Sequence, residues 1–210
     1  MVEHIQMEHL MTAKNKTDKH QERQQKLKEK VDERIASATK DKGLLLVITG
    51  NGKGKSTSGF GMVTRSVGHG LTAAVCQFIK GTWDCGERNL LSEQGVPFYV
   101  MNTGFTWETQ NKEADIAAAD IVWQQAKKLL KDKSVNTILL DELTYMLSYH
   151  YLDIDEVLEC IANRPEGQHV IVTGRACHRR LIEIADTVSE VQSIKHAFDN
   201  GIQVQKGIDW

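Results

Sequence analysis

The 210-residue chain is poor in cysteine, with four residues and no C-x-x-C pair: Cys76, Cys85, Cys160 and Cys177. Hydrophobic residues make up 40% of the sequence, enough to build a core without disulfides. This usage favours reduced, cytosolic thiols over a disulfide framework. The adjacent residues Cys177 and His178 make a poor metal pair, because neighbouring side chains rarely face one ligand site.

Long apolar runs and an excess of charge are also absent. The longest wholly apolar run has five residues, 44–48, whereas a membrane-spanning helix needs about 20. No apolar N-terminal segment predicts a signal peptide. A net charge of −2 argues against a dominant nucleic-acid-binding surface. We therefore expect a cytoplasmic protein that has neither membrane nor nucleic-acid partners.

A protein nucleophile is missing as well. No serine stands in a nucleophile-elbow setting, and no cysteine and histidine are spaced as a dyad. Only two prolines occur, and there is no internal repeat or low-complexity tract. If the chain transfers a group, we expect the attacking atom to belong to the substrate.

The most informative segment that is present has the sequence TGNGKGKST, at positions 49–57. It lies between the apolar run and a predicted helix, in the order typical of a phosphate-binding P-loop. Glycines let backbone N–H groups surround phosphate oxygens, and a helix N-terminus favours an anion. Lys55 adds a mobile cation, and Ser56 offers a hydroxyl to a divalent ion. The predicted nucleotide-binding residues of this loop are Gly50, Asn51, Gly52, Lys53, Gly54, Lys55, Ser56 and Thr57.

The loop departs from the general pattern G-x-x-x-x-G-K-[ST]. That pattern would place its first glycine at position 49, where this chain has Thr49, and the first glycine is Gly50. The loop is therefore one residue short. An ordinary NTPase grip on the triphosphate is not to be assumed from it.

Beyond residue 43, predicted strands and helices alternate. The clearest helix, 112–131, has acids near its start and lysines near its end, as the helix dipole favours. Asp153 and Glu156 have the spacing of a cap that opens another helix, which Pro165 bounds. The apolar strand candidates are 44–49, 73–79, 97–102, 136–141, 169–173 and 187–192. We predict an α/β fold of the P-loop NTPase (RecA-like) type, with three layers and a mostly parallel sheet covered on both faces.

The N-terminal part differs in composition. Residues 1–19 are polar and without a clear period, which predicts a mobile, disordered segment. Residues 20–38 predict a charged helix on which Leu27, Val31 and Ile35 form a thin apolar stripe. Such a helix either docks on this domain or on a second copy of it, or remains solvated and partly frayed. The expected division is 1–19, a helical region at 20–42, and a nucleotide-binding domain at 43–210.

The strand candidate 136–141 ends in two acids, Asp141 and Glu142. In P-loop proteins a carboxylate on a neighbouring strand helps to hold the metal, and open α/β sheets bind ligands at these strand ends. We predict metal ligation by Ser56, Asp141 and Glu142, with Asp141 acting directly or through water. Glu142 shares the metal, orients a neighbour or, in a hydrolase, positions water.

Several basic residues have two interpretations. Arg175 follows the strand candidate 169–173, where it either reaches phosphates or lies on the surface with its stem packed down. Arg65, three turns into the P-loop helix, carries the same ambiguity. Both are candidate nucleotide-binding residues. Lys80 or Arg88, after the second strand candidate, would meet a polar substrate rim.

Phe105 and Trp107 flank a single residue in a chain with only 6% aromatics. They follow one strand candidate and precede a helix, so they belong to a loop near the strand ends. Either both rings fold back into the core, or they form an apolar wall for a flat ligand beside the nucleotide.

With these residues together, the chain resembles the ATP:corrinoid adenosyltransferases of the P-loop (CobA/BtuR) family. The resemblance covers residues 21–210. Small departures are Ser56 in place of the usual threonine and Trp210 in place of tyrosine or phenylalanine, and residues 1–19 have no match. The ordered blocks that carry it are TGNGKGKST (49–57), RSVGHG (65–70), QFIKG (77–81), GERN (86–89), GFTW (104–107), LDEL (140–143), TGR (173–175), KHAF (195–198) and GID (207–209).

The resemblance implies transfer of the 5′-deoxyadenosyl group of ATP to the cobalt of a reduced corrinoid, with release of triphosphate. The acceptor would be cob(I)alamin or cob(I)yrinic acid a,c-diamide, in adenosylcobalamin synthesis or salvage. Cob(I) would then be the nucleophile, which accounts for the missing protein nucleophile. ATP would lie reversed in the shortened loop, so that ribose C5′ faces the acceptor.

The resemblance also implies Mg²⁺ or Mn²⁺, a homodimer, a flavoprotein reductase as partner, and an N-terminal helix that helps to close the site. Phe105 and Trp107 would act in catalysis by covering the lower face of the corrin, with Glu142 as a further catalytic residue. Excluding a lower axial ligand favours four-coordinate Co(II), which is easier to reduce. Two alternatives are a RecA-like ATP hydrolase or kinase and a non-enzymatic nucleotide-binding regulator, and the short loop and the GFTW segment argue against both.

Overall fold

The computed structural model describes residues 2–79, 84–101 and 111–209, with side chains from residue 19 onward. The chain divides into two units, Met1–Asp41 and Lys42–Trp210. The first unit is the helix α1 (Val2–Ser37), which contains the helix predicted from residue 20 and continues toward the N-terminus through residues 2–19. The mobility expected of residues 1–19 stays a prediction. The apolar stripe of α1 is exposed: Leu27 at 57%, Val31 at 43% and Ile35 at 66%.

The second unit is built on a parallel sheet that has six strands in the described residues. Their spatial order is β3-β2-β4-β5-β1-β6, and each neighbouring pair is parallel. Every predicted strand is confirmed to within two residues at each end. The strands are β1 (Leu45–Thr49), β2 (Ala73–Gln77), β3 (Phe98–Val100), β4 (Thr137–Asp141), β5 (His169–Thr173) and β6 (Thr187–Glu190).

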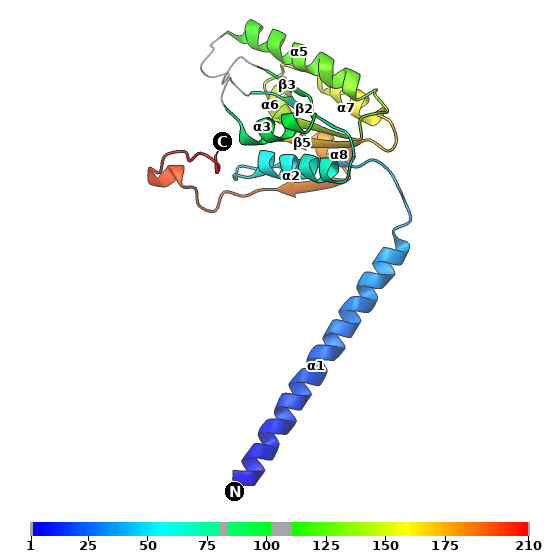
Figure 1. Cartoon of the computed structure of the whole chain (residues 1–210), viewed down its shortest axis with the longest axis vertical. Coiled ribbons are helices and arrows are strands. Elements are labelled where there is room, and N and C mark those ends of the chain that lie inside the picture. Colours follow the sequence, from blue (N-terminus) through cyan, green and yellow to red (C-terminus); the bar gives the residue numbers. More distant parts are fainter. Residues whose placement is uncertain (1, 80–83, 102–110, 210) are drawn as a thin grey trace. The chain divides into compact units, whose positions relative to one another are not determined.

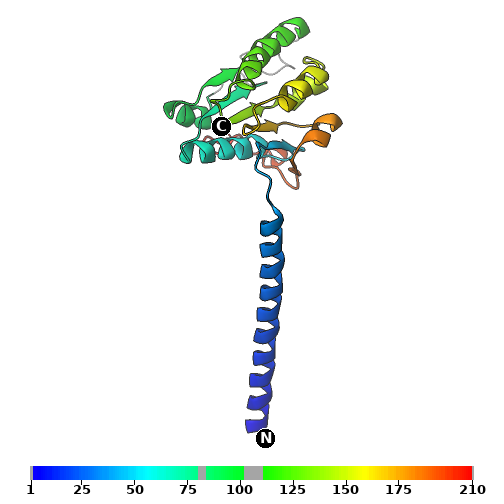
Figure 2. The same ribbon diagram turned by 90° about the vertical axis from the view of Figure 1, so that its right-hand side faces the viewer.

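Helices cover both faces of the sheet, which confirms the predicted three-layer α/β fold (Figures 1 and 2). One face carries α2 (Lys55–Gly68) and α3 (Gly86–Glu93). The other face carries α5 (Lys112–Leu129), α6 (Leu143–Ser148), α7 (Ile154–Ala162) and α8 (Arg179–Ile184). A short 3-10 turn, η1 (Phe198–Asn200), lies in the C-terminal segment.

Alternate residues along the strands β1 to β5 enter two different cores, because successive side chains of a strand point to opposite faces. Val75, Leu139 and Ile171 pack with Phe60 of α2. Their neighbours along the strands pack with Trp123 of α5 and with apolar residues of α6, α7 and α8. The central strands are therefore packed on both faces. Their carboxyl ends are the edge of the sheet at which α/β proteins bind ligands.

The predicted cap at Asp153 is confirmed, since its Oδ1 accepts a hydrogen bond from the backbone N–H of Glu156 at 2.9 Å. The Glu156 side chain does not return to the cap. It accepts from Trp123 Nε1 at 3.1 Å and from Lys127 Nζ at 2.6 Å, which joins α7 to α5.

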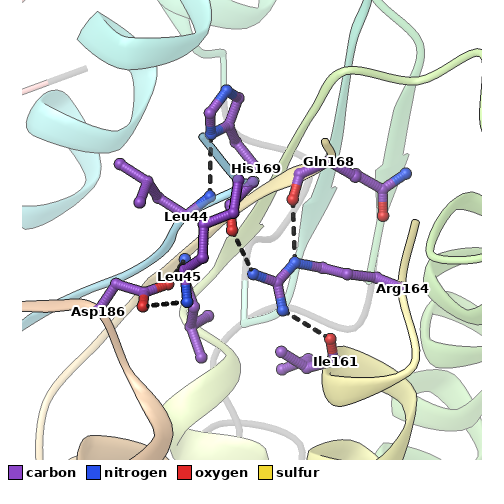
Figure 3. A network of polar contacts seen from close by, with 9 residues as sticks. Leu44, Leu45, Ile161, Arg164, Gln168, His169 and Asp186 are labelled. Carbon is purple, nitrogen blue, oxygen red and sulfur yellow. Dashed lines mark hydrogen bonds and ion pairs between the residues drawn. The ribbon is translucent and has the colours of Figure 1, made fainter. Parts of the chain in front are cut away.

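A polar network fixes the start of β1, the strand that leads to the glycine-rich loop (Figure 3). Arg164 donates to three backbone carbonyls, those of Ile161, Gln168 and Gly43, at 2.7 to 2.9 Å. Leu44 N–H donates to His169 Nδ1, and Leu45 N–H donates to Asp186 Oδ2 at 2.9 Å. The backbone before β1 is thus held at the amino ends of the strands, opposite the loop that β1 carries.

Candidate functional site

The glycine-rich loop between β1 and α2 has a backbone that requires glycine. Gly50 and Gly54 have positive φ values, 98° and 112°. A Cβ on Gly50 would lie 2.5 Å from the Val191 carbonyl oxygen, and one on Gly52 would lie 2.6 Å from that of Gln192. Gly52 N–H also donates to Val191 O at 2.7 Å. The segment that follows β6 therefore packs against the loop and gives it its shape.

The first turn of α2 is free of competing anions. Gly54 caps the helix without a side-chain hydrogen bond, and the first turn contains no acidic residue. The first N–H groups of a helix have no partners within it, and together with the helix dipole they favour an anion. Residues 50–57 therefore have a backbone that suits an anion, and phosphate binding by them stays a prediction.

Lys55 is a nearly buried cation, with 6% of its surface exposed. Its Nζ donates to the carbonyl oxygen of Gly52 at 2.7 Å. Burial is the largest cause that lowers the pKa of Lys55; Glu142 opposes the shift, Arg175 adds to it, and Asp141 opposes it. A buried ammonium group is expensive without an anionic partner, so this position suits a phosphate.

The carboxyl ends of β2, β4 and β5 bring three polar residues into a row. Gln77 and Asp141 are register partners in neighbouring strands. Thr173 Oγ1 donates to Asp141 Oδ1 at 2.6 Å, and Gln77 Nε2 donates to Asp141 Oδ2 at 3.2 Å. Asp141 is completely buried by these contacts. Its carboxylate therefore lies behind the residues that line the pocket.

The adjacent acid, Glu142, lies differently. Its backbone is left-handed, with a φ of 61°, and its N–H donates to Thr173 Oγ1 at 3.0 Å. The turn places Glu142 in the lining of a pocket that the residues of the glycine-rich loop also line. The two predicted acids thus take different positions, with Glu142 at the pocket and Asp141 beneath it.

Arg175 also lines this pocket, which favours the first of its two interpretations. Gly174 precedes it with a φ of 134°, and a Cβ there would lie 2.1 Å from Thr144 Oγ1. That hydroxyl donates to the Arg175 carbonyl oxygen at 2.6 Å. The close approach of α6 to this turn therefore fixes the backbone at Arg175 and requires glycine at position 174.

The pocket has a volume of about 470 Å³ and extends from the glycine-rich loop to α3 and the C-terminal segment. Four acidic residues and four lysines or arginines line it, so neither sign of charge is in large excess. The acids are Asp84, Glu87, Glu142 and Asp209, and the lysines and arginines are Lys53, Lys55, Arg88 and Arg175.

Other predicted residues are not brought to this pocket or cannot be placed. Arg65 lies in the last turn of α2, exposed, and it is absent from the pocket lining. Ten residues along a helix correspond to about 15 Å, which separates it from Lys55. Phe105, Trp107 and Lys80 lie outside the described residues. Arg88 does line the pocket, and its contact with a substrate stays a prediction.

Sequence reasoning missed several lining residues: Gln77, Asp84, Cys85, Glu87, His196, Val204 and Asp209. Four of these fall in the motif blocks at 77–81, 86–89, 195–198 and 207–209, which was the signal that could have identified them. The nucleotide-binding candidates from Asn51 to Thr57 line the pocket, together with Glu142 and Arg175.

Known proteins match this chain along most of its length. The family model for ATP:corrinoid adenosyltransferase BtuR/CobO/CobP matches residues 41–210, which include the loop, both acids and Arg175. The chain belongs to the ATP:corrinoid adenosyltransferase family. A second model, the N-terminal segment of cob(I)alamin adenosyltransferase, matches residues 11–35 within α1.

The sequences of three corrinoid adenosyltransferases support this assignment. The chain is 57% identical over 193 residues to the corrinoid adenosyltransferase of Escherichia coli K12, an alignment that covers 92% of this chain and 98% of that protein. It is 55% identical to the corrinoid adenosyltransferase CobA of Salmonella typhimurium, with the same coverage. It is 48% identical to the enzyme of Pseudomonas aeruginosa, covering 93% and 97% of the two chains.

Membership of the adenosyltransferase family makes the chain an enzyme that uses ATP and a corrinoid, and it sets aside the hydrolase, kinase and regulator alternatives. Within the part of the chain that the structure describes, no helix is long and apolar enough to cross a membrane. Over the same residues, no group of three or more His, Cys, Asp or Glu side chains is arranged to bind a metal ion.

Proposed function

We propose that the pocket binds ATP through the shortened loop and transfers its 5′-deoxyadenosyl group to the cobalt of a reduced corrinoid. The electron pair of Co(I) attacks C5′ while the bond from C5′ to oxygen breaks, so cobalt is formally oxidised to Co(III) and triphosphate leaves with the bonding electrons. The observation that supports this most directly is the buried ammonium of Lys55, which lines a pocket of about 470 Å³ beside a loop one residue short.

The loop residues would bind the leaving group. Backbone N–H groups around residues 50–57, with Lys55 and Arg175, meet the negative charge that grows on triphosphate as the bond breaks. Such fixed donors are most effective where charge develops in the transition state. The short loop is expected to hold ATP reversed, with C5′ rather than the γ-phosphate toward the acceptor.

Mg²⁺, or Mn²⁺ in its place, is the proposed metal. Mg²⁺ prefers oxygen ligands and often takes one or two carboxylates together with substrate phosphates. Ser56 and Glu142 line the same pocket and offer a hydroxyl and a carboxylate, while Asp141 lies behind them for contact through water. The ion would neutralise part of the triphosphate charge. These residues would orient it and the phosphates bound to it.

Phe105 and Trp107 are proposed to cover the lower face of the corrin. A bulky apolar wall there would keep an axial water or base off cobalt and favour four-coordinate Co(II). Phe105→Ala and Trp107→Ala should lower that Co(II) fraction in absorption or EPR spectra of the ternary complex while ATP affinity stays nearly unchanged. Loss of ATP binding with an unaltered Co(II) spectrum would instead identify them as core aromatics.

A homodimer in which α1 helps to close the site is also proposed. The exposed stripe of Leu27, Val31 and Ile35 needs an apolar partner, and the match of residues 11–35 to a family N-terminal segment supports a role in the reaction. Deleting residues 1–38 should leave a folded remainder with weakened corrinoid binding. Full activity of the truncated chain would show that the helix is dispensable. A flavoprotein reductase is the proposed source of electrons.

Product analysis tests the proposed function as a whole. The full chain is incubated with MgATP and chemically reduced cob(I)alamin, and the products are separated. Adenosylated corrinoid and triphosphate in equal amounts are expected. Formation of ADP or orthophosphate without adenosylated corrinoid would refute the proposal. The same assay with cob(I)yrinic acid a,c-diamide compares the two acceptors.

A further inference from the structure

Gln77 is a pocket residue to which sequence reasoning gave no role. It is the last residue of β2, is completely buried and nevertheless lines the pocket that holds Lys55 and Ser56. Its register partner across β4 is Asp141. A polar side chain at this position faces two environments, the buried carboxylate and the pocket.

The orientation of the Gln77 amide follows from its chemistry, because the nitrogen only donates hydrogen bonds and the oxygen only accepts them. Asp141 Oδ2 lies 3.2 Å from the Gln77 nitrogen, and a carboxylate needs a donor, which only the amide nitrogen provides. The amide oxygen must then point elsewhere. Among the described residues, Gln77 Oε1 is buried and has no hydrogen-bond partner. A buried oxygen left without a donor costs free energy. Because the residue Gln77 lines the pocket, a ligand bound there is the natural source of the missing donor.

We propose that Gln77 is a substrate-contacting residue whose amide oxygen accepts a hydrogen bond from an O–H group of the bound nucleotide complex. Two sources carry this chemistry: a water held by the divalent ion, and a ribose hydroxyl. Phosphate oxygens are excluded as partners, because they are acceptors like the amide oxygen. The inference rests on the proposed binding of ATP in this pocket and adds the donor that ATP or its metal must present.

The amide also explains why a carboxylate would not serve at position 77. Glutamate has no N–H with which to hold Asp141, and it would place a second negative charge beside Asp141. It would also bring that charge to the pocket that receives the triphosphate. Gln77 combines a donor for the buried acid with an acceptor for the substrate, and it adds no charge.

Binding measurements on the full chain test this proposal. Titration calorimetry would give dissociation constants for MgATP, for its 2′-deoxy and 3′-deoxy analogues, and for inorganic triphosphate with and without Mg²⁺. Gln77→Met keeps the length of the side chain and removes both polar ends. Thr173→Val is the comparison variant: at a residue outside the pocket lining, it removes the other side-chain hydrogen bond to Asp141 and also the acceptor of the Glu142 N–H.

We expect Gln77→Met to weaken MgATP binding by about three- to ten-fold, the range of one neutral hydrogen bond. If the donor is a ribose hydroxyl, this loss disappears with one deoxy analogue and with inorganic triphosphate. If the donor is metal-bound water, the loss persists with inorganic triphosphate, disappears without Mg²⁺, and exceeds the loss caused by Thr173→Val.

An equal loss in Gln77→Met and Thr173→Val with every ligand would overturn the inference, since Gln77 would then only support Asp141. Unchanged binding in Gln77→Met would overturn it as well. Failure of the wild-type chain to bind MgATP would instead count against the proposed function, and Lys55→Ala serves as the reference for a lost nucleotide site.

Discussion

Lys53 and Asp209 form an ion pair that joins the glycine-rich loop to the C-terminal segment, with Nζ and Oδ1 2.5 Å apart. The Gln205 N–H donates to the other oxygen of Asp209 at 2.7 Å. The hydrogen bond from Lys53 is the largest cause that lowers the pKa of Asp209, followed by that from Gln205. Both charged residues line the pocket, so a carboxylate lies where a cation of the loop would otherwise meet phosphate.

Asp209→Asn should therefore strengthen the binding of ATP and of inorganic triphosphate. The substitution removes a negative charge from the pocket and releases Lys53. Because the pair is partly solvated, the gain should be roughly two- to five-fold at low salt and should shrink as salt screens the charges. Calorimetry at two ionic strengths measures both effects. Asp199→Asn makes the same change in net charge outside the pocket lining, and an equal gain there would refute the local explanation.

ATP binding should take up protons at alkaline pH because of Lys55. Burial lowers the pKa of this lysine below its ordinary value of 10.5 in the free protein. A bound triphosphate favours the charged form and so raises the pKa again. Affinity should consequently fall as pH rises through the lowered value, where the free protein loses the proton that binding requires.

Calorimetry in buffers of different ionisation enthalpy measures this uptake of protons. Lys55→Arg provides the comparison, because arginine keeps its proton throughout the range. The uptake should vanish in that variant. If the variant still takes up the same number of protons, another group is responsible.

Asp141→Asn should weaken Mg²⁺-dependent ATP binding while the chain remains folded. The substitution preserves shape but removes a charge that Thr173 and Gln77 hold in place. Hydrogen bonds to charged groups suggest a loss of roughly ten-fold or more in affinity at low Mg²⁺, partly restored by higher Mg²⁺. Glu142→Gln compares the acid that lines the pocket. If ATP binding by Asp141→Asn depends on Mg²⁺ as it does in the wild type, the carboxylate of Asp141 has only a structural role.

Arg164→Ala should destabilise the fold without affecting nucleotide binding. The variant leaves three backbone carbonyls without their charged donor, at a cost of about 2–3 kcal/mol in the free energy of unfolding. Urea unfolding of the full chain measures this change. Arg179→Ala is the control, because that side chain is 90% exposed and makes an i,i+4 pair worth at most about 0.5 kcal/mol. Equal effects of the two substitutions would contradict the assigned role of the network.

The strands and the phosphate loop could be predicted because their signals are local. Apolar runs of five or six residues and a glycine-rich turn can be recognised from a short stretch of sequence, without knowing which residues lie beside them in space. The cap at Asp153 is local in the same way, and its N–H bond to Glu156 spans three residues.

The missed contacts depend on pairings that sequence distance conceals. Gln77 meets Asp141 across a separation of 64 residues, and its role follows from the order of the strands rather than from the residues beside it. Asp209 reaches the loop only because the C-terminal segment returns to the pocket. Arg65 is the reverse case, since it lies in the last turn of the helix that begins at the site and does not line the pocket.

The segment after β6 that packs against the glycine-rich loop affects the local stability of that loop. Val191 bonds to Gly52 and Thr49 just beyond β6, and β6 is an edge strand whose four residues are all exposed. Amides at the margin of a sheet exchange with solvent through small openings that need far less free energy than global unfolding. The free energy needed to open the loop locally should therefore be close to that of the edge strand β6, and lower than that of the central strands. A nucleotide that immobilises the loop would slow amide exchange along β6, a strand that does not line the pocket.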